Sequence, residues 1–90
     1  MANRKVQFNV LRDVIDEREK QDKKWGEQNH APAVWQNILM EEVGGASKAV
    51  LEYVFGSGSV EDYRAEMVQV AAAAIAAIES FDRRKVKKAA

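Results

Sequence analysis

Apolar residues recur along the chain at helical spacing, and the first stretch with this pattern runs from about Arg4 to Lys24. Its apolar stripe, three or four residues apart, consists of Phe8, Leu11, Val14, Ile15 and, at the same spacing, Arg18. The other faces are densely charged, for example at Arg12, Asp16 and Glu17. A period near 3.6 residues with one polar side is typical of an amphipathic helix that is solvated on that side.

A second helix is predicted from about Ala33 to Phe55, after a loop over residues 25–32. Pro32 suits the first turn of a helix, where its missing N–H is not needed, and Gly56 is a common residue just past a helix end. The predicted apolar stripe consists of Trp35, Ile38, Leu39, Val43, Ala46, Val50 and Val54. The charged residues Glu41, Lys48 and Glu52 fall on the opposite, solvated side.

A third helix is predicted to start at Ser59, because Ser59 and Asp62 form an S-x-x-D start signal. We expect this helix to extend to about Arg83. The residues expected to face inward are Val60, Tyr63, Met67, Val70, Ala71, Ala74, Ile75, Ile78 and Phe81. The basic tail over residues 83–90 is predicted to be a frayed, solvated helix end, the alternative being a nucleic-acid-binding arm.

Strand signals are absent, so the sequence predicts an all-α fold of three main helices in one domain spanning residues 1–90. Alanines over residues 71–77 permit close approach of a neighbouring helix, and they recur on more than one face. This repetition predicts a second helix surface from another subunit. We therefore expect a homo-dimer or homo-tetramer that completes a helical bundle.

Composition narrows the classes of partner. Fourteen basic and fourteen acidic residues cancel, which argues against a dedicated nucleic-acid binder. The absence of cysteine excludes disulfides and thiol chemistry. The longest apolar run, residues 70–78, is far short of the roughly 20 residues that span a bilayer. With no long apolar core in the first ten residues to mark a signal peptide, we expect a cytoplasmic protein without membrane or nucleic-acid partners.

Two carboxylates fall at unusual positions. Glu42 shares the apolar stripe of the second helix, and Glu66 lies at the flank of the stripe of the third, with Gln69 following on the same side. Antiparallel packing of the two helices would bring Glu42 near Glu66, and a cation such as Mg²⁺ would relieve their repulsion. In the alternative interpretation, Glu42 reaches the rim and pairs with Arg64 or a lysine.

Three motifs in this order resemble the MazG-like branch of the all-α nucleoside triphosphate pyrophosphatases, in particular its phage-type and dCTP-hydrolysing relatives. They are Glu17-Arg18-x-x-Gln21-Asp22-x-Lys24-Trp25-Gly26-Glu27-Gln28-Asn29-His30, Trp35-x-x-Ile38-Leu39-Met40-Glu41-Glu42-Val43-Gly44, and Tyr63-Arg64-x-Glu66-Met67-Val68-Gln69-Val70-Ala71-Ala72. The resemblance covers residues 17–83. It implies a MazG-like helical bundle that hydrolyses (d)NTP to (d)NMP and pyrophosphate with Mg²⁺, Mn²⁺ being a possible substitute.

The four acidic metal-binding positions of that family fall here on Glu42, Gly45, Glu66 and Gln69. Gly45 supplies no ligand, and Gln69 offers a neutral amide oxygen. Magnesium needs only one or two protein carboxylates when substrate phosphates complete its shell. The resemblance is therefore compatible with an enzyme whose metal site is weakened, and also with a helical module that binds nucleotide or a protein partner without hydrolysis.

The resemblance also implies roles for single residues. Glu42 and Glu66 are expected as the principal metal ligands with Gln69. Glu41 is expected to act as a general base or to contact the metal ligands without binding the metal itself. The expected substrate-binding residues are Lys24, Trp25, Asn29, His30 and Arg64. For Trp25, stacking on a nucleobase and capping the hydrophobic core are both open, and a lone loop histidine such as His30 can also be without a role.

Overall fold

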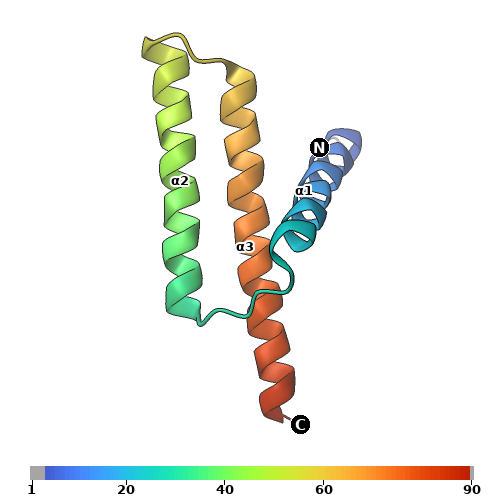
Figure 1. The fold of residues 1–90 in the computed structure, drawn as a ribbon. Helices are drawn as coiled ribbons and strands as arrows, with labels where there is room; N and C mark the ends of the chain where they lie inside the picture. Colours follow the sequence, from blue (N-terminus) through green and yellow to red (C-terminus); the bar gives the residue numbers. More distant parts are fainter. Residues whose placement is uncertain (1–3, 90) are drawn as a thin grey trace.

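The computed structural model describes residues 4–89, with side chains for residues 4–84, and this range contains three helices and no strand. They are α1 (Arg4–Trp25), α2 (Pro32–Phe55) and α3 (Val60–Ala89), shown in Figure 1. The all-α prediction is confirmed, and the first two helices end within one residue of the predicted bounds. The predicted end of the third helix at Arg83 is wrong, because the helix continues to Ala89. The tail side chains beyond residue 84 lie outside the described residues.

Local signals set the helix ends. The Oγ of Ser59 accepts a hydrogen bond from the backbone N–H of Asp62 at 3.1 Å, which confirms the predicted start signal of α3. Pro32 is the first residue of α2, and the N–H of Gly56 closes the other end on the carbonyl of Glu52 at 2.9 Å. Gly26 follows α1 with φ of 73°, a left-handed conformation that favours glycine. Each of these devices acts within a few residues of the chain.

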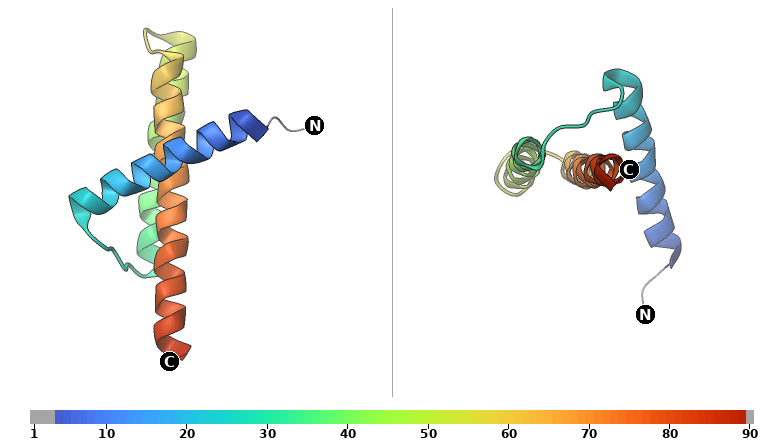
Figure 2. Two further views of the ribbon diagram at one scale, coloured as in Figure 1. Left: turned by 90° about the vertical axis from the view of Figure 1, so that its right-hand side faces the viewer. Right: turned by 90° about the horizontal axis from the view of Figure 1, so that it is seen from below.

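Helix α3 lies in the middle of the molecule. Helix α2 runs antiparallel to it as a hairpin, and α1 crosses the opposite side of α3 (Figures 1 and 2). The loop from α1 to α2 passes around the lower half of α3 in Figure 1, so that the end of α1 comes near the start of α2. This arrangement confirms the antiparallel packing predicted for the second and third helices.

The buried core consists mainly of small residues. It contains Ala72, Ala73, Ala76 and Ser80 of α3, Trp35 and Ala46 of α2, and Val14 of α1. Small side chains on α3 let α1 and α2 approach it closely, as the alanine run predicted for neighbouring helices. Both of these helices belong to the same chain, whereas the second helix surface was predicted from another subunit. The expected inward face of α3 is wrong at Met67, Ile78, Val60 and Phe81, which are 43–59% exposed. At 100° per residue Met67 lies opposite Ala76, so Met67 points away from the buried face of α3.

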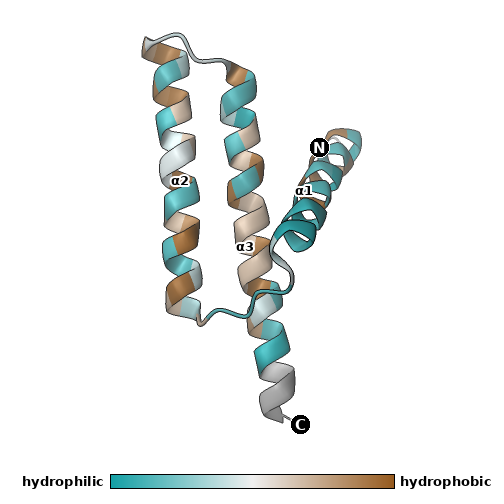
Figure 3. Cartoon of the chain, in the orientation of Figure 1, coloured by the Kyte–Doolittle hydropathy of each residue, from teal (hydrophilic) through white to brown (hydrophobic). Residues whose placement is uncertain are grey.

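The same correction applies to parts of the other two stripes. Phe8, Leu11 and Ile15 of α1 are exposed by 47–63%, and Val54 of α2 by 59%. Figure 3 shows hydrophobic bands along α2 and α3 and at the end where they join, whereas the half of α1 next to the loop is hydrophilic. Each helix therefore buries one edge of its apolar stripe in the core, and the other apolar side chains of the stripe are at least partly exposed to solvent.

The molecule is extended for its length. Its principal extents are 51 × 31 × 26 Å, and its radius of gyration of 15.2 Å compares with about 12 Å for a compact domain of 90 residues. The chain exposes 6935 Å², against about 5,300 Å² for a folded monomer of 10.1 kDa. None of the helices in residues 4–89 has the length and apolar character needed to cross a membrane.

Candidate functional site

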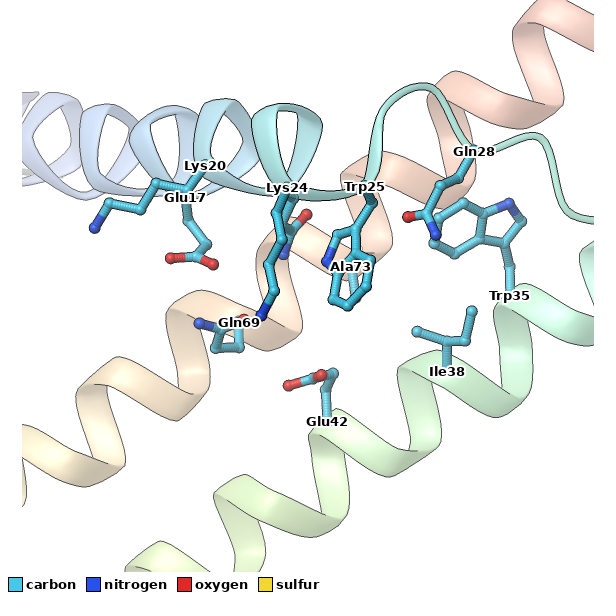
Figure 4. A pocket seen from close by; sticks show the side chains of 11 residues that line it. Glu17, Lys20, Lys24, Trp25, Gln28, Trp35, Ile38, Glu42, Gln69 and Ala73 are labelled. Carbon is cyan, nitrogen blue, oxygen red and sulfur yellow. The ribbon is translucent and has the colours of Figure 1, made fainter.

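A pocket of about 450 Å³ lies where the three helices meet, and Figure 4 shows it from close by. Its lining residues are Glu17, Lys20, Gln21, Lys24, Trp25, Gln28, Trp35, Ile38, Glu42, Gln69 and Ala73. Residues 17, 20, 21 and 24 lie on one face of α1, because they follow the i, i+3, i+4, i+7 spacing. All four are polar or charged, so the α1 side of the pocket is polar. Carboxylates, ammonium groups, amides and two indole rings thus border one space.

Ion pairs to α3 hold α1 over this pocket. The guanidinium of Arg18 donates to Glu79 of α3, to Asp22 at 3.0 Å and to Gln21 at 3.0 Å. Burial would lower the pKa of Arg18, but the carboxylates of Glu79 and Asp22 together raise it above its ordinary value. The Arg18 side chain is only 12% exposed, whereas that of Glu79 is 40% exposed, so this link between α1 and α3 is half-buried.

A second ion pair joins the two helices at the surface. Arg64 of α3 donates to Asp13 of α1 at 2.7 Å, and both side chains are exposed. Arg64 does not line the pocket, and it does not pair with Glu42. The alternative in which Arg64 neutralises Glu42 is therefore wrong.

The loop between α1 and α2 is tied to the distal half of α3. Arg83 donates to the side-chain oxygen of Asn29 at 2.8 Å and to the backbone carbonyl of Gln28 at 3.1 Å. The fully buried Ser80 donates its hydroxyl to the carbonyl of His30 at 3.2 Å. The side chain of Asn29 also donates to Glu27 at 2.7 Å. These bonds fix where the loop carries Gln28 along the pocket.

His30 lies in a different, apolar groove of about 200 Å³. Its ring meets the buried Trp35 edge-on, with 5.1 Å between the ring centroids and an interplanar angle of 64°. Ile78 and Phe81 border the same groove. Asn29 lines neither of these spaces, so the two loop residues expected at the substrate instead contact the protein.

Trp25 stands at the open edge of the pocket. The residue is 60% exposed, and the ammonium of Lys24 lies 4.7 Å from the centroid of its ring. Because the buried indole of the core is that of Trp35, the alternative in which Trp25 caps the core is wrong. Trp25 is therefore an exposed ring in the lining of the pocket, with the ammonium of Lys24 over one of its faces.

The carboxylate of Glu42 points into the pocket from α2 (Figure 4). It is half-buried and has no hydrogen bond or ion pair within the described residues. Burial raises its pKa above the ordinary value of 4.5, and the nearby charges of Glu66, Glu41 and Glu17 raise it further. The prediction that Glu42 faces the interior is confirmed, and its carboxylate lacks a cation.

Gln69 lines the pocket across from Glu42, whereas Glu66 borders an adjoining hollow of about 310 Å³ beside Gly45 and Lys48. The charge of Glu66 still reaches Glu42, since it contributes to the raised pKa of Glu42. Glu41 is exposed on the outer side of α2 and does not line the pocket. Of the residues expected at the site, the structure thus gathers Lys24, Trp25, Glu42 and Gln69, with Glu66 next to them.

The sequence analysis missed the contribution of α1. Glu17 and Lys20 fall on the faces of the first helix that are predicted to be solvated, and Glu17, Gln21 and Gln28 belong to the first motif without a role of their own. Their spacing with Lys24 was available as a signal, since all four α1 positions fall on one helix face. The sequence does not show that this face of α1 lies against α2 and α3 around a pocket.

The donors around Glu42 suit magnesium better than a softer metal. In residues 4–84, no group of three His, Cys, Asp or Glu side chains is close enough to hold a metal ion unaided. Glu42 and Glu66 offer carboxylates, and Gln69 offers an amide oxygen. Oxygen donors in this number fit Mg²⁺, which commonly keeps several waters and takes further oxygens from substrate phosphates.

Comparison of the chain with protein-family models, with curated proteins and with solved structures finds no significant match.

Proposed function

We propose that the protein is a Mg²⁺-dependent nucleoside triphosphate pyrophosphohydrolase that converts (d)NTP to (d)NMP and pyrophosphate. The observation that carries this proposal is the pocket, which combines an exposed aromatic ring, two lysines and an uncompensated carboxylate in one space of nucleotide size. The motif resemblance gives the reaction type, and the pocket supplies groups for each part of the substrate.

The ring of Trp25 is suited to stack on the nucleobase, since it is exposed in the lining of the pocket and stacking accepts any base. Lys24 lies beside that ring, where its ammonium can bind the phosphate chain. Lys20, one turn earlier on α1, extends the positive charge along the pocket. The α1 side of the pocket therefore binds substrate.

The opposite side of the pocket would hold the metal. Glu42 and Glu66 are the proposed ligands together with the amide oxygen of Gln69. A bound Mg²⁺ or Mn²⁺ neutralises phosphate charge and polarises the phosphorus centre. In this scheme, Glu41 acts only through its charge on Glu42, because its own side chain faces outward.

Arg64, Asn29 and His30 become positioning residues in this proposal. Arg64 holds α1 against α3, and the other two hold the loop that carries Gln28. Their replacement should therefore affect activity through stability or the shape of the pocket, and contact with substrate is not required.

The test is pyrophosphate release from a panel of standard and modified nucleoside triphosphates, with Mg²⁺ and with Mn²⁺. Metal-dependent release that is lost in Glu42→Gln and kept in Glu19→Gln supports the proposal. Glu19 is a matched control because it is an exposed glutamate that borders neither the pocket nor the hollow of Glu66. Release that is unchanged in Glu42→Gln would contradict the assignment of the site.

A second candidate function is a helical module that binds nucleotide, or a protein partner, without hydrolysing nucleotide. It is favoured by Gly45, which leaves one expected ligand position without a side chain. Folded protein that binds a nucleoside triphosphate but releases no pyrophosphate above the Glu42→Gln background would support this function.

We further propose that the protein acts as a homo-dimer or homo-tetramer. The surface of 6935 Å² exceeds the monomer expectation by about 1,600 Å², and a stable interface needs only about 800 Å² from each partner. Met67 and Ile78 lie on the open apolar face of α3. Sedimentation should show an oligomer, and Met67→Glu should dissociate it. Asp82→Asn also changes the charge by one unit at an exposed position of α3, and it should leave the oligomer intact.

A further inference from the structure

Four titratable side chains line the pocket, namely Glu17, Lys20, Lys24 and Glu42. Hydrolysis needs a group that accepts the proton of the attacking water, in addition to the groups that bind substrate and metal. The two lysines are cations suited to phosphates, so they are poor acceptors. The choice of base within the pocket therefore lies between the two glutamates.

Metal binding removes Glu42 from this choice. A carboxylate that ligates a cation loses basicity, because the positive charge favours its ionised form. The same argument applies to Glu66. Two other acceptors lie in the wrong place, since Glu41 faces outward and His30, the one histidine of the chain, lies in the apolar groove.

Glu17 meets the geometric requirement. Its carboxylate extends from α1 into the space above Gln69, and the carboxylate of Glu42 points into the same space from the opposite side (Figure 4). Within the described side chains Glu17 forms no hydrogen bond or ion pair, so both of its oxygens are free to accept. The two carboxylates are close enough for the charge of Glu17 to raise the pKa of Glu42.

The position of Glu17 along α1 also matches an extended nucleotide. Glu17 and Lys24 are seven residues apart on one helix face, which is about 10.5 Å along the axis. Trp25 stands at the Lys24 end of this row. A nucleobase on Trp25 would leave the sugar and first phosphate to extend towards Glu17.

We infer that Glu17 is the general base that activates water for attack on the α-phosphorus, an inference that rests on the proposed function. The water oxygen forms a bond to the α-phosphorus while the bond from that phosphorus to the α,β-bridging oxygen breaks. The electron pair of the broken bond leaves with pyrophosphate. The water proton passes to the carboxylate of Glu17, which later returns it to solvent.

The experiment compares Glu17→Gln with Glu19→Gln in the full chain. Glu19 is an exposed glutamate on α1 that does not line the pocket, so it controls for the loss of one charge. For Glu17→Gln, kcat for metal-dependent pyrophosphate release should fall about 100-fold or more, the usual contribution of a general base. KM and the Mg²⁺ concentration at half-maximal rate should stay within about threefold, because Glu17 binds neither substrate nor metal in this scheme.

A second variant separates loss of the base from loss of structure. In Glu17→Ala, added formate should restore part of the rate, because a small carboxylate can occupy the vacated space, whereas formate should not affect Glu19→Ala. A kcat of Glu17→Gln within about threefold of the unaltered protein would overturn the inference. Recovery of the rate at high Mg²⁺ would also overturn it, since Glu17 would then be a ligand. If the unaltered protein releases no pyrophosphate, the proposed function itself fails.

Discussion

The carboxylate of Glu66 lies against the backbone of Gly45. A Cβ atom at position 45 would be 2.9 Å from Oε2 of Glu66, which is closer than real Cβ contacts. At the preceding glycine, Gly44, a Cβ atom would meet nothing within 4 Å. Of the two adjacent glycines of α2, only Gly45 therefore has a neighbouring side chain, Glu66, in the space that a Cβ atom would take.

Replacing each glycine by alanine measures that difference. In a helix interior, Gly→Ala adds about 0.5–1 kcal/mol of stability. Gly44→Ala should show this gain in full, whereas Gly45→Ala should show less because Glu66 must move. Urea unfolding of both variants gives the comparison, and an equal gain at the two positions would mean that the Glu66 carboxylate moves aside without cost.

Gly45→Glu tests the consequence for the metal. Glu66 is flexible at its far end, so a new carboxylate at position 45 can be accommodated beside it. If the metal site is only weakened, this variant should lower the Mg²⁺ concentration needed for half-maximal release by about tenfold. A large gain from a very low background would favour the module that has lost hydrolysis. Gly44→Glu is the control, and an equal effect there would contradict a specific ligand role.

Glu42→Gln should stabilise the protein near neutral pH while it removes activity. The pKa of Glu42 is raised in the folded state, so the folded protein holds that proton more tightly than the unfolded chain. The stabilising effect of this proton is present below pH 4.5 and is lost as the pH rises from 4.5 through the raised pKa. Glutamine at position 42 is uncharged at every pH, so the variant does not lose stability in this way as the pH rises.

Thermal unfolding at several pH values gives the check. The melting temperature of Glu42→Gln should exceed that of the unaltered protein by a few degrees at pH 7, since about 1 kcal/mol corresponds to about 4–8 °C in a domain of this size. The difference should disappear at pH 4, and Mg²⁺ should reduce it at pH 7. Glu19→Gln, at an exposed glutamate outside both the pocket and the hollow of Glu66, should show none of these changes. A lower melting temperature for Glu42→Gln at pH 7 would contradict the unpaired state of Glu42.

Arg18→Ala should detach α1 from α3. The variant loses the charged hydrogen bonds to Glu79 and Asp22 and the packing of the side-chain stem, for a cost of about 2–3 kcal/mol. Arg12→Ala is the matched control, because among the side chains of residues 4–84 Arg12 bonds only to Asn9 of the same helix, at 3.2 Å. Urea unfolding followed by circular dichroism should separate the two variants, and equal losses would show that the contact with Glu79 adds nothing.

The helices of this protein could be predicted from the sequence because their determinants are local. Ser59 caps α3 from three residues away, Pro32 starts α2, and Gly56 ends it. The orientation of Glu42 was also predictable, since it follows from its phase relative to Trp35 and Ala46 on the same helix. Only the far end of α3 was predicted wrongly, because no residue after Arg83 interrupts the helix.

The packing surfaces could not be predicted in the same way. An apolar pattern identifies a face that avoids water, but it does not identify the neighbour that covers it. On α3 the small residues Ala72 and Ala76 are buried inside the molecule, whereas Met67 is left open on the opposite face. The pairing of Arg64 with Asp13 and the place of Glu17 in the pocket both depend on how α1 crosses α3. That crossing joins residues about 50 positions apart in the sequence, and no local motif encodes it.

The central position of α3 has a consequence for the order of assembly. The α2–α3 hairpin is closed by a short loop and can form from contacts near in sequence, whereas α1 docks on α3 through long-range contacts. Helix α1 is then expected to undock as one unit before the hairpin unfolds, and its amide hydrogens should exchange faster. Since α1 forms one side of the pocket, a bound nucleotide should oppose this undocking and slow exchange in α1.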